Sequence, residues 1–116
     1  RAANAWPADY FISIHANANT DPVVNGTEVY VYRKYTQSYY LAQHILSAIV
    51  DVVGTRDNGV RVNPSLYVLR RTNMPAVLVE LAYVTNAGDA EKLETMQPEF
   101  ARGIYEGLLS YFGLDQ

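Results

Sequence analysis

Short apolar runs alternate with longer stretches of helical period along this chain, and that alternation restricts its fold more than any other feature. Runs at 10–14, 27–33 and 76–79 are rich in β-branched and aromatic residues, which is typical of buried strands. A further strand is predicted at Leu66–Leu69 after Pro64, and Asp57-Asn58-Gly59 is a strong turn signal. The strands therefore come in short, separate pieces.

Three segments have the period of a helix instead. Over residues 38–53, apolar side chains recur at intervals of three and four, which indicates an amphipathic helix. Two more helices are predicted, one from Thr85 or Asn86 to about Met96 and one over 98–112. Strands that alternate with amphipathic helices predict an α/β fold, with a mostly parallel, twisted sheet covered by helices on both faces in a three-layer α/β/α arrangement.

The composition excludes several classes of protein. A length of 116 residues suits one domain or part of one, and we expect a single unit over 1–116. A formal net charge of −3 gives no basic footprint for a nucleic acid. No window approaches the ~20 apolar residues of a membrane span. The absence of cysteine excludes disulfides and thiolate metal sites.

Two ionisable residues follow the most apolar strands. His15 comes after Phe-Ile-Ser-Ile, and Glu80 comes after Val-Leu-Val. In open α/β sheets, ligands bind outside the carboxyl ends of the strands, so parallel neighbouring strands would bring both side chains to one crevice. A carboxylate against apolar walls has a raised pKa that suits proton transfer, and a neutral imidazole is a common zinc ligand.

Simpler interpretations exist for each of these residues. A histidine at a strand end is often a hydrogen-bonded structural residue, and a glutamate there often reaches solvent. His44 lies on the boundary of the central helix and has no motif around it. Six further acidic residues are interpreted as solvated or capping charges: Asp9, Glu28, Asp57, Asp89, Glu91 and Glu94. Spacing alone leaves these alternatives open.

The segments that carry His15 and Glu80 resemble a known family. Three stretches carry the resemblance, in order and at natural spacing: Ala8–Ala18, Gly26–Tyr30 and Leu69–Leu81. They are similar to the zinc-dependent N-acetylmuramoyl-L-alanine amidases of the type-3 family, and the match continues through Tyr83–Asn86 into the next helix. Asn58 is a departure, because the family often has arginine before the Gly-Val pair.

The resemblance implies a cell-wall hydrolase that cuts the bond between N-acetylmuramic acid and L-alanine of peptidoglycan. His15 would be a ligand of Zn²⁺, and Glu80 would be the general base and then the acid, activating water and protonating the leaving nitrogen. Asn17 and the loop after it would shape the substrate groove. A bacterial or phage-encoded protein that is secreted to the outside or to the cell wall is implied as well.

The same comparison implies that part of the domain lies outside this chain. Family members have two further zinc ligands, a His and a Glu, upstream of the segment that resembles residues 1–8. We therefore expect residues 1–116 to be the C-terminal two-thirds of a catalytic domain, without its N-terminal strand and helix. Activity of this piece alone would be impaired, and its exposed sheet edge would favour a homodimer or strand exchange.

Two alternatives belong to other classes of protein. A noncatalytic peptidoglycan-binding or scaffold module would keep the same fold and lack the metal site. An α/β hydrolase without metal would need a nucleophile, but the chain has no cysteine and no Gly-x-Ser-x-Gly elbow. An upstream His and Glu would distinguish the amidase from the first alternative.

Overall fold

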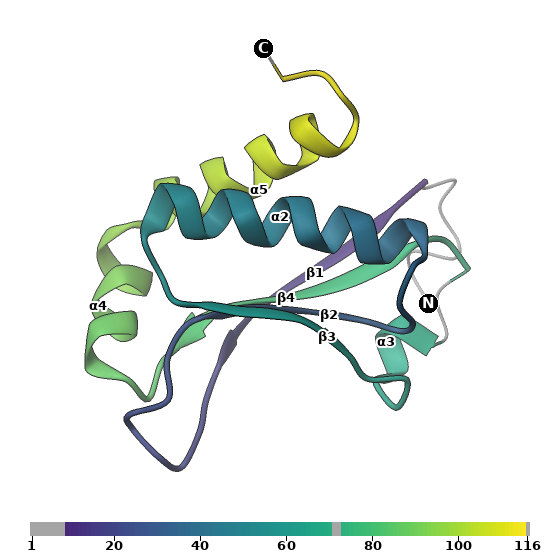
Figure 1. The fold of residues 1–116 in the computed structure, drawn as a ribbon. Coiled ribbons are helices and arrows are strands. Elements are labelled where there is room, and N and C mark those ends of the chain that lie inside the picture. The colour runs from purple at the N-terminus through teal and green to yellow at the C-terminus, as the bar shows by residue number, and fades with distance from the viewer. Residues whose placement is uncertain (1–8, 71–72, 116) are drawn as a thin grey trace.

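Four strands and four helices make up the chain in a computed structural model, which describes residues 9–70 and 73–115 (Figure 1). The resembling stretches also include Ala8, Arg71 and Thr72, which lie outside the described residues. In chain order the elements are β1 (Phe11–Asn17), β2 (Thr27–Val31), α2 (Gln37–Val53), β3 (Asp57–Val62), α3 (Tyr67–Arg70), β4 (Ala76–Tyr83), α4 (Ala87–Thr95) and α5 (Gln97–Tyr111).

The four strands form one mixed sheet in the order β1-β4-β2-β3. The outer pairings, β1 with β4 and β2 with β3, are parallel, whereas β2 runs antiparallel to β4 at the centre. The expected α/β fold is therefore confirmed, in a sheet that is mixed. The antiparallel centre brings the start of β2 to the same end of the sheet as the ends of β1 and β4.

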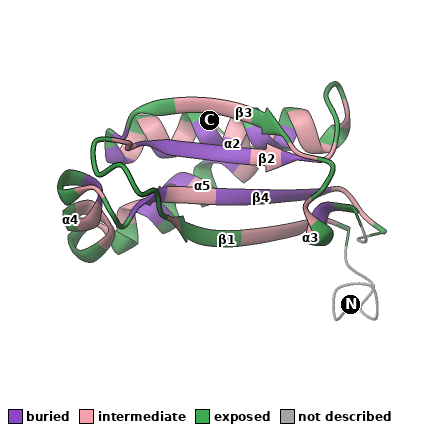
Figure 2. Ribbon diagram, turned by 90° about the horizontal axis from the view of Figure 1, so that it is seen from below, coloured by how far each residue is buried: buried purple, intermediate pink, exposed green. Residues whose placement is uncertain are grey.

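One face of the sheet carries the main core. Helices α2 and α5 lie side by side across this face, and α4 lies at one end (Figure 1). The fully buried side chains of Val29, Val31, Val77 and Val79 meet the buried stripe of α2 there. On the opposite face, the short helix α3 packs Leu69 on one end of the sheet, and the rest is uncovered by described helices (Figure 2). We call that second side the open face.

Local signals set the ends of α2. Thr36 caps the first turn, where its side chain accepts a hydrogen bond from the backbone N–H of Tyr39. Gly54 ends the helix in the left-handed conformation, with φ of 83°, which an L side chain adopts only with strain. Between these caps, Leu41, Ile45 and Ile49 are fully buried, so the apolar stripe read from the sequence is the one that faces the sheet.

Helix α5 approaches α2 closely because it has glycines at the contact. A Cβ added at Gly103 would lie 2.8 Å from the Cα of Ile49, and one at Gly107 would lie 2.6 Å from the Cα of Ile45. Such distances are far below normal van der Waals contact, so the two helices pack with backbone against backbone. The pair closes the core on its outer side.

The strand expected at Leu66–Leu69 is wrong, because residues 67–70 form helix α3. Asn63 starts this turn: its side chain accepts a hydrogen bond from the backbone N–H of Ser65, and its carbonyl accepts one from the N–H of Leu66. Local turn chemistry therefore prevails over the apolar composition of the segment.

The turn expected at Asp57-Asn58-Gly59 is also corrected, because these residues begin strand β3. Turn chemistry is present inside the strand: Gly59 has φ of 86°, and its N–H donates to the Asp57 carboxylate over 2.9 Å. The pairing of β2 with β3 shifts register at this point, which is a bulge. The chain thus keeps the local turn and continues as a strand.

The remaining helices begin near the residues that the sequence indicated. Asn86 is the N-cap of α4, and Pro98 lies in the first turn of α5. Within residues 9–70 and 73–115, no helix is long and apolar enough to cross a membrane.

Replacing Gly107 by alanine tests the close contact between α2 and α5. We expect the free energy of unfolding to fall by about 1–3 kcal/mol, because the added methyl group overlaps the backbone at Ile45. Urea unfolding measures this change. The matched control is Gly88→Ala in α4, where the nearest atom would lie 3.5 Å away and helix propensity predicts a gain of up to ~1 kcal/mol. Equal effects of the two substitutions would contradict the packing.

Candidate active site

A row of ionisable side chains crosses the open face of the sheet. His15 on β1 is the register partner of Glu80 on β4, and Glu80 is in turn opposite Glu28 on β2. Register partners on neighbouring strands point to the same face about 5 Å apart. The structure thus brings together His15 and Glu80, as the strand pattern predicted.

Their position in the strands differs from the expectation in one respect. The strand β1 continues to Asn17 and β4 continues to Tyr83, so both side chains project from the sheet rather than beyond its carboxyl end. Phe11 and Leu78, on the same face, contact α3 or its neighbours, whereas the end that carries His15 and Glu80 is left open (Figure 2). A substrate would therefore approach the flat of the sheet.

Glu80 has an unsatisfied carboxyl oxygen. Its Oε1 is buried and makes no hydrogen bond among the described residues. Burial raises the pKa of the Glu80 carboxyl above its ordinary value; the charge of His15 lowers this pKa, and the carboxylate of Glu28 raises it. A carboxyl group with a raised pKa and a free oxygen is suited to accept and return a proton.

His15 is exposed and is oriented by a neighbour on its own strand. Its Nε2 lies 2.6 Å from the hydroxyl oxygen of Ser13, two residues earlier on the same face. The direction of this hydrogen bond depends on the imidazole tautomer. Because one ring nitrogen is engaged, the other is available to a ligand, and such an arrangement is common for histidines that bind metals.

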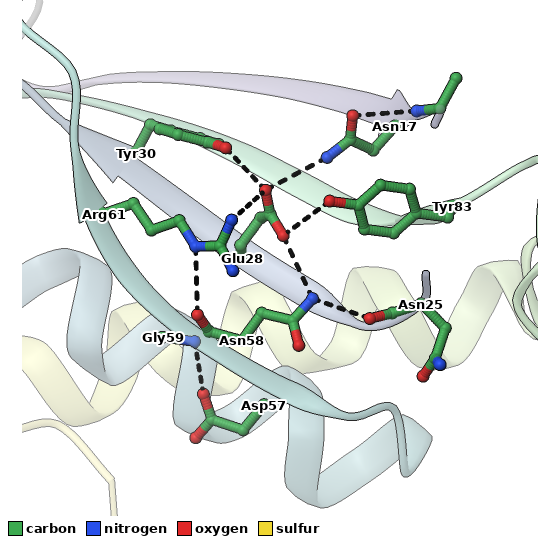
Figure 3. Close-up of polar contacts among 10 residues, drawn as sticks. Asn17, Asn25, Glu28, Tyr30, Asp57, Asn58, Gly59, Arg61 and Tyr83 are labelled. Carbon is green, nitrogen blue, oxygen red and sulfur yellow. Dashed lines mark hydrogen bonds and ion pairs between the residues drawn. The ribbon is translucent and has the colours of Figure 1, made fainter. Parts of the chain in front are cut away.

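Glu28 was interpreted from sequence as a solvated or capping charge, and the structure corrects this. The residue is fully buried, in the middle of the sheet (Figure 3). Donors from all four strands surround its carboxylate: at Oε1, Tyr83 Oη (3.0 Å) and Asn58 Nδ2 (3.1 Å); at Oε2, Tyr30 Oη (2.7 Å), Asn17 Nδ2 (3.3 Å) and Arg61 Nη1 (3.4 Å). These contacts replace the water that a buried carboxylate loses.

The two tyrosines remain donors over the whole physiological range. Burial, together with the hydrogen bond to Glu28 and its negative charge, raises the pKa of Tyr83 to about 12. The same causes, again led by burial, raise the pKa of Tyr30 above its ordinary value. Each hydroxyl therefore keeps its proton and points it at Glu28.

Asp89 was likewise interpreted from sequence as a solvated or capping charge, and the structure corrects this. It is buried, and its Oδ2 accepts hydrogen bonds from the backbone N–H groups of Gly26 (2.8 Å) and Tyr83 (2.9 Å). It thereby ties the start of β2 to the end of β4. The other acidic residues of that group are exposed, as expected: Asp9, Asp57, Glu91 and Glu94.

Asn17, the predicted substrate-binding residue, ends β1 beside this cluster. Its Nδ2 donates to Glu28, and its Oδ1 accepts a hydrogen bond from the N–H of Ala18 over 2.9 Å. The amide therefore anchors the start of the loop 18–26. That loop extends below the sheet, on the side of the open face (Figure 1).

His44 lies apart from this row, among the helices that cover the opposite face. Its Nδ1 is 2.8 Å from the hydroxyl oxygen of Ser110 on α5. A hollow of about 650 Å³ adjoins it, lined by Asp51 and Glu106 among others, and it contains neither His15 nor Glu80. This hollow is thus separate from the row of ionisable residues.

The residues fit a metal site only in part. His15 supplies an imidazole beside the unsatisfied oxygen of Glu80. Over the described ranges, no group of three or more His, Cys, Asp or Glu side chains is arranged to hold a metal ion. A catalytic zinc normally has three protein ligands, so the described residues alone do not complete one.

The comparisons with known proteins agree with the sequence resemblance. Residues 1–110 match the model of a family described as N-acetylmuramoyl-L-alanine amidase. The chain is 42% identical over 116 residues to the amidase LytC of Bacillus subtilis and 41% identical over 120 residues to the amidase CwlM of Bacillus licheniformis. It also superposes on the crystal structure of an amidase from Clostridium difficile 630 with a TM-score of 0.89 and 38% identity.

These similarities cover nearly all of this chain and only part of its relatives. The matches to LytC, CwlM and the C. difficile amidase include 97%, 99% and 99% of this chain. They span 23% of LytC, 45% of CwlM and 63% of the C. difficile chain. The relatives therefore contain substantial further sequence.

The substitution Tyr83→Phe tests the hydrogen bonds around Glu28. We expect the free energy of unfolding to fall by about 1.5–3 kcal/mol, because a buried carboxylate loses one of its donors. Chemical denaturation provides the measurement. The control is Tyr105→Phe, since this side chain is 60% exposed and its hydroxyl group is hydrated. A loss no larger than that of the control would mean that Glu28 does not depend on this hydroxyl.

The pH dependence of stability tests the environment of Glu80. A carboxyl whose pKa is raised by folding binds its proton more tightly in the folded state, so it lowers stability as pH rises above the unfolded value of about 4.3. In the metal-free protein, Glu80→Gln should therefore raise the melting temperature at pH 7, and this gain should shrink toward pH 4. Glu94→Gln, at an exposed site, is the control. A pH-independent difference would contradict the raised pKa.

Proposed function

The chain belongs to the N-acetylmuramoyl-L-alanine amidase family, and on that basis we propose that the protein carrying it hydrolyses the amide bond between N-acetylmuramic acid and L-alanine in peptidoglycan. One observation supports this most: His15 and Glu80 are adjacent on the open face, and Glu80 has a buried oxygen with no hydrogen-bond partner in the described part of the chain. A proton acceptor beside a metal-binding imidazole is the pair that such a hydrolysis requires.

We propose Zn²⁺ as the cofactor, with His15 as one of its ligands. When bound, the ion would supply a Lewis acid that polarises the amide carbonyl and lowers the pKa of water. Ser13 would hold the His15 ring in orientation through the contact at Nε2. The described residues do not complete a zinc site, so further ligands would have to come from outside them.

The proposed source of those ligands is the upstream part of the same catalytic domain. Residues 1–116 would then be its C-terminal two-thirds, which is consistent with the 63% share of the C. difficile chain that is matched. Strand β1 is an edge of the sheet, so an upstream strand would have a place to pair beside it. Strand exchange or a homodimer would compete for that edge in the isolated piece.

Glu80 is the proposed general base and acid. Its Oε1 would take a proton from the attacking water and pass it to the leaving nitrogen of L-alanine. The raised pKa favours this role, because it makes the carboxylate a stronger base toward the proton of the water. Asn17 would contribute indirectly, since it holds the loop 18–26 that borders the open face.

The substrate implies the place of action. Peptidoglycan lies outside the cell membrane, so we propose a bacterial or phage-encoded protein that works outside the cell or in the wall. The formal net charge of −3 agrees with a carbohydrate–peptide substrate rather than a nucleic acid.

A noncatalytic module that binds peptidoglycan is the second candidate. Its support is that the described residues contain no three-ligand cluster. Such a module would bind wall fragments through the open face without consuming them. Turnover by the full-length protein distinguishes the two.

The experiment measures hydrolysis of a purified muropeptide by the full-length protein. The product is detected through the new amino group that appears on L-alanine. We expect a chelator to abolish turnover and added Zn²⁺ to restore it. Glu80→Gln should keep the fold and lower turnover at least ~100-fold, because the proton acceptor is lost. Glu94→Gln, an exposed carboxylate on α4, should be unaffected. Near-normal turnover of Glu80→Gln would remove this residue from the mechanism, and activity that survives chelation would refute the zinc.

A further inference from the structure

A hollow with two arginines lies next to the Glu28 cluster. It measures about 300 Å³ and is bordered by the loop 18–26 on one side and by the start of β3 on the other. Arg56, Asn58 and Arg61 line it from β3 and the residue before it, and Tyr83 and Asn25 line it from the neighbouring segments. Among the described residues that line it, none is acidic. We call this hollow the arginine pocket.

Arg61 is fixed in place by two contacts. Its Nη1 lies 3.4 Å from Glu28 Oε2, and its Nε donates to the carbonyl oxygen of Asn58 over 3.3 Å (Figure 3). Its side chain is nevertheless 48% exposed. The guanidinium is therefore oriented by the protein while about half of the side chain remains accessible, which reduces the entropy lost on binding an anion.

Arg56 supplies a charge without a counter-ion. Its side chain is exposed, and it makes no ion pair within 9–70 and 73–115. The nearby carboxylate of Glu28 is fully buried and already has four neutral donors besides Arg61. The accessible surface of the pocket is thus cationic in a chain whose formal net charge is −3.

We propose that the arginine pocket is a subsite for a carboxylate on the peptide arm of the substrate. This inference rests on the proposed amidase function and extends it to substrate recognition. The peptide in a muramoyl–peptide amide has its amino end acylated, so that end carries no positive charge, whereas its far end carries a carboxylate. Arginine is the side chain best suited to carboxylates, because its planar donors match both oxygens.

The position of the pocket determines which carboxylate it can reach. Asn58 lies on β3, two strands from Glu80, and strands in a sheet are about 4.8 Å apart. The pocket is therefore about 10 Å from the proposed reaction centre. An extended peptide advances about 3.3 Å per residue, so the bound carboxylate belongs to a residue about two or three beyond L-alanine.

The test compares two N-acetylated peptides that begin with L-alanine and are three residues long. One ends in a free carboxylate and the other in a carboxamide, and calorimetry measures their affinity for the full-length protein. We expect the free carboxylate to bind wild type about 10-fold more tightly, which is the range for a hydrogen-bonded ion pair. Arg56→Gln should abolish this difference. Arg102→Gln, which removes an exposed arginine on α5, should retain it.

Arg61→Lys provides a second variant, because it keeps the charge next to Glu28 while losing the planar donors. It should reduce the preference for the carboxylate and leave the fold intact. Equal affinity of wild type for both peptides, binding of neither peptide, or a preference that survives Arg56→Gln would overturn the subsite.

Turnover of a muropeptide is measured in parallel. A wild type that prefers the carboxylate peptide and cleaves nothing would refute the amidase function while the subsite stands.

Discussion

The buried carboxylate of Glu28 is the interaction on which the open face depends. An uncompensated charge at this depth would cost several kcal/mol, so the fold must supply partners for it. Those partners come from all four strands, and they include Asn17 at the end of β1 and Tyr83 at the end of β4. The network therefore holds the strand ends at fixed positions around Glu80, whose Oε1 has no hydrogen-bond partner among the residues that the structure describes. The Glu28 carboxylate has hydrogen-bond partners that stabilise the sheet, whereas the neighbouring Glu80 carboxyl is available for the proposed proton transfer.

The apolar core and the candidate site lie on opposite faces of the sheet. Side chains alternate along each strand, so Val29 and Val79 point to α2 while Glu28 and Glu80 point away from it. The apolar side gains its stability from contact with α2 and α5, including the close approach at Gly107. These contacts lie on the far side of the sheet from the Glu28 network, so the apolar core and that network stabilise the sheet from opposite faces.

Several features could be predicted from the sequence because they depend on local patterns. The helix over 38–53 follows from its apolar repeat, and Asn86 is a cap that the sequence indicates directly. The adjacency of His15 and Glu80 followed from two apolar strands that each lead to an ionisable residue. Their roles rest on the family resemblance and remain predictions.

Other features depend on which strands become neighbours, and no local pattern contains that information. Glu28 lies in a strand whose residues are nearly all buried, but its five donors are between 2 and 55 residues away along the chain. The antiparallel pairing of β2 with β4 brings them together. Asp89 likewise bonds Gly26, 63 residues distant. The errors at Leu66–Leu69 and at Asp57-Asn58-Gly59 have a different origin, since there one local signal competed with another.

The open face contains the Glu80 carboxyl, the oriented imidazole of His15 and the arginine pocket, and together these would suit the proposed amidase and its proposed recognition of the peptide arm. The most direct test of this arrangement is anomalous diffraction at the zinc absorption edge from crystals of the complete catalytic domain. We expect a metal peak about 2.0–2.1 Å from a ring nitrogen of His15, beside the Glu80 carboxylate. A peak at His44 between α2 and α5, or an active domain whose His15 contacts no metal, would contradict it.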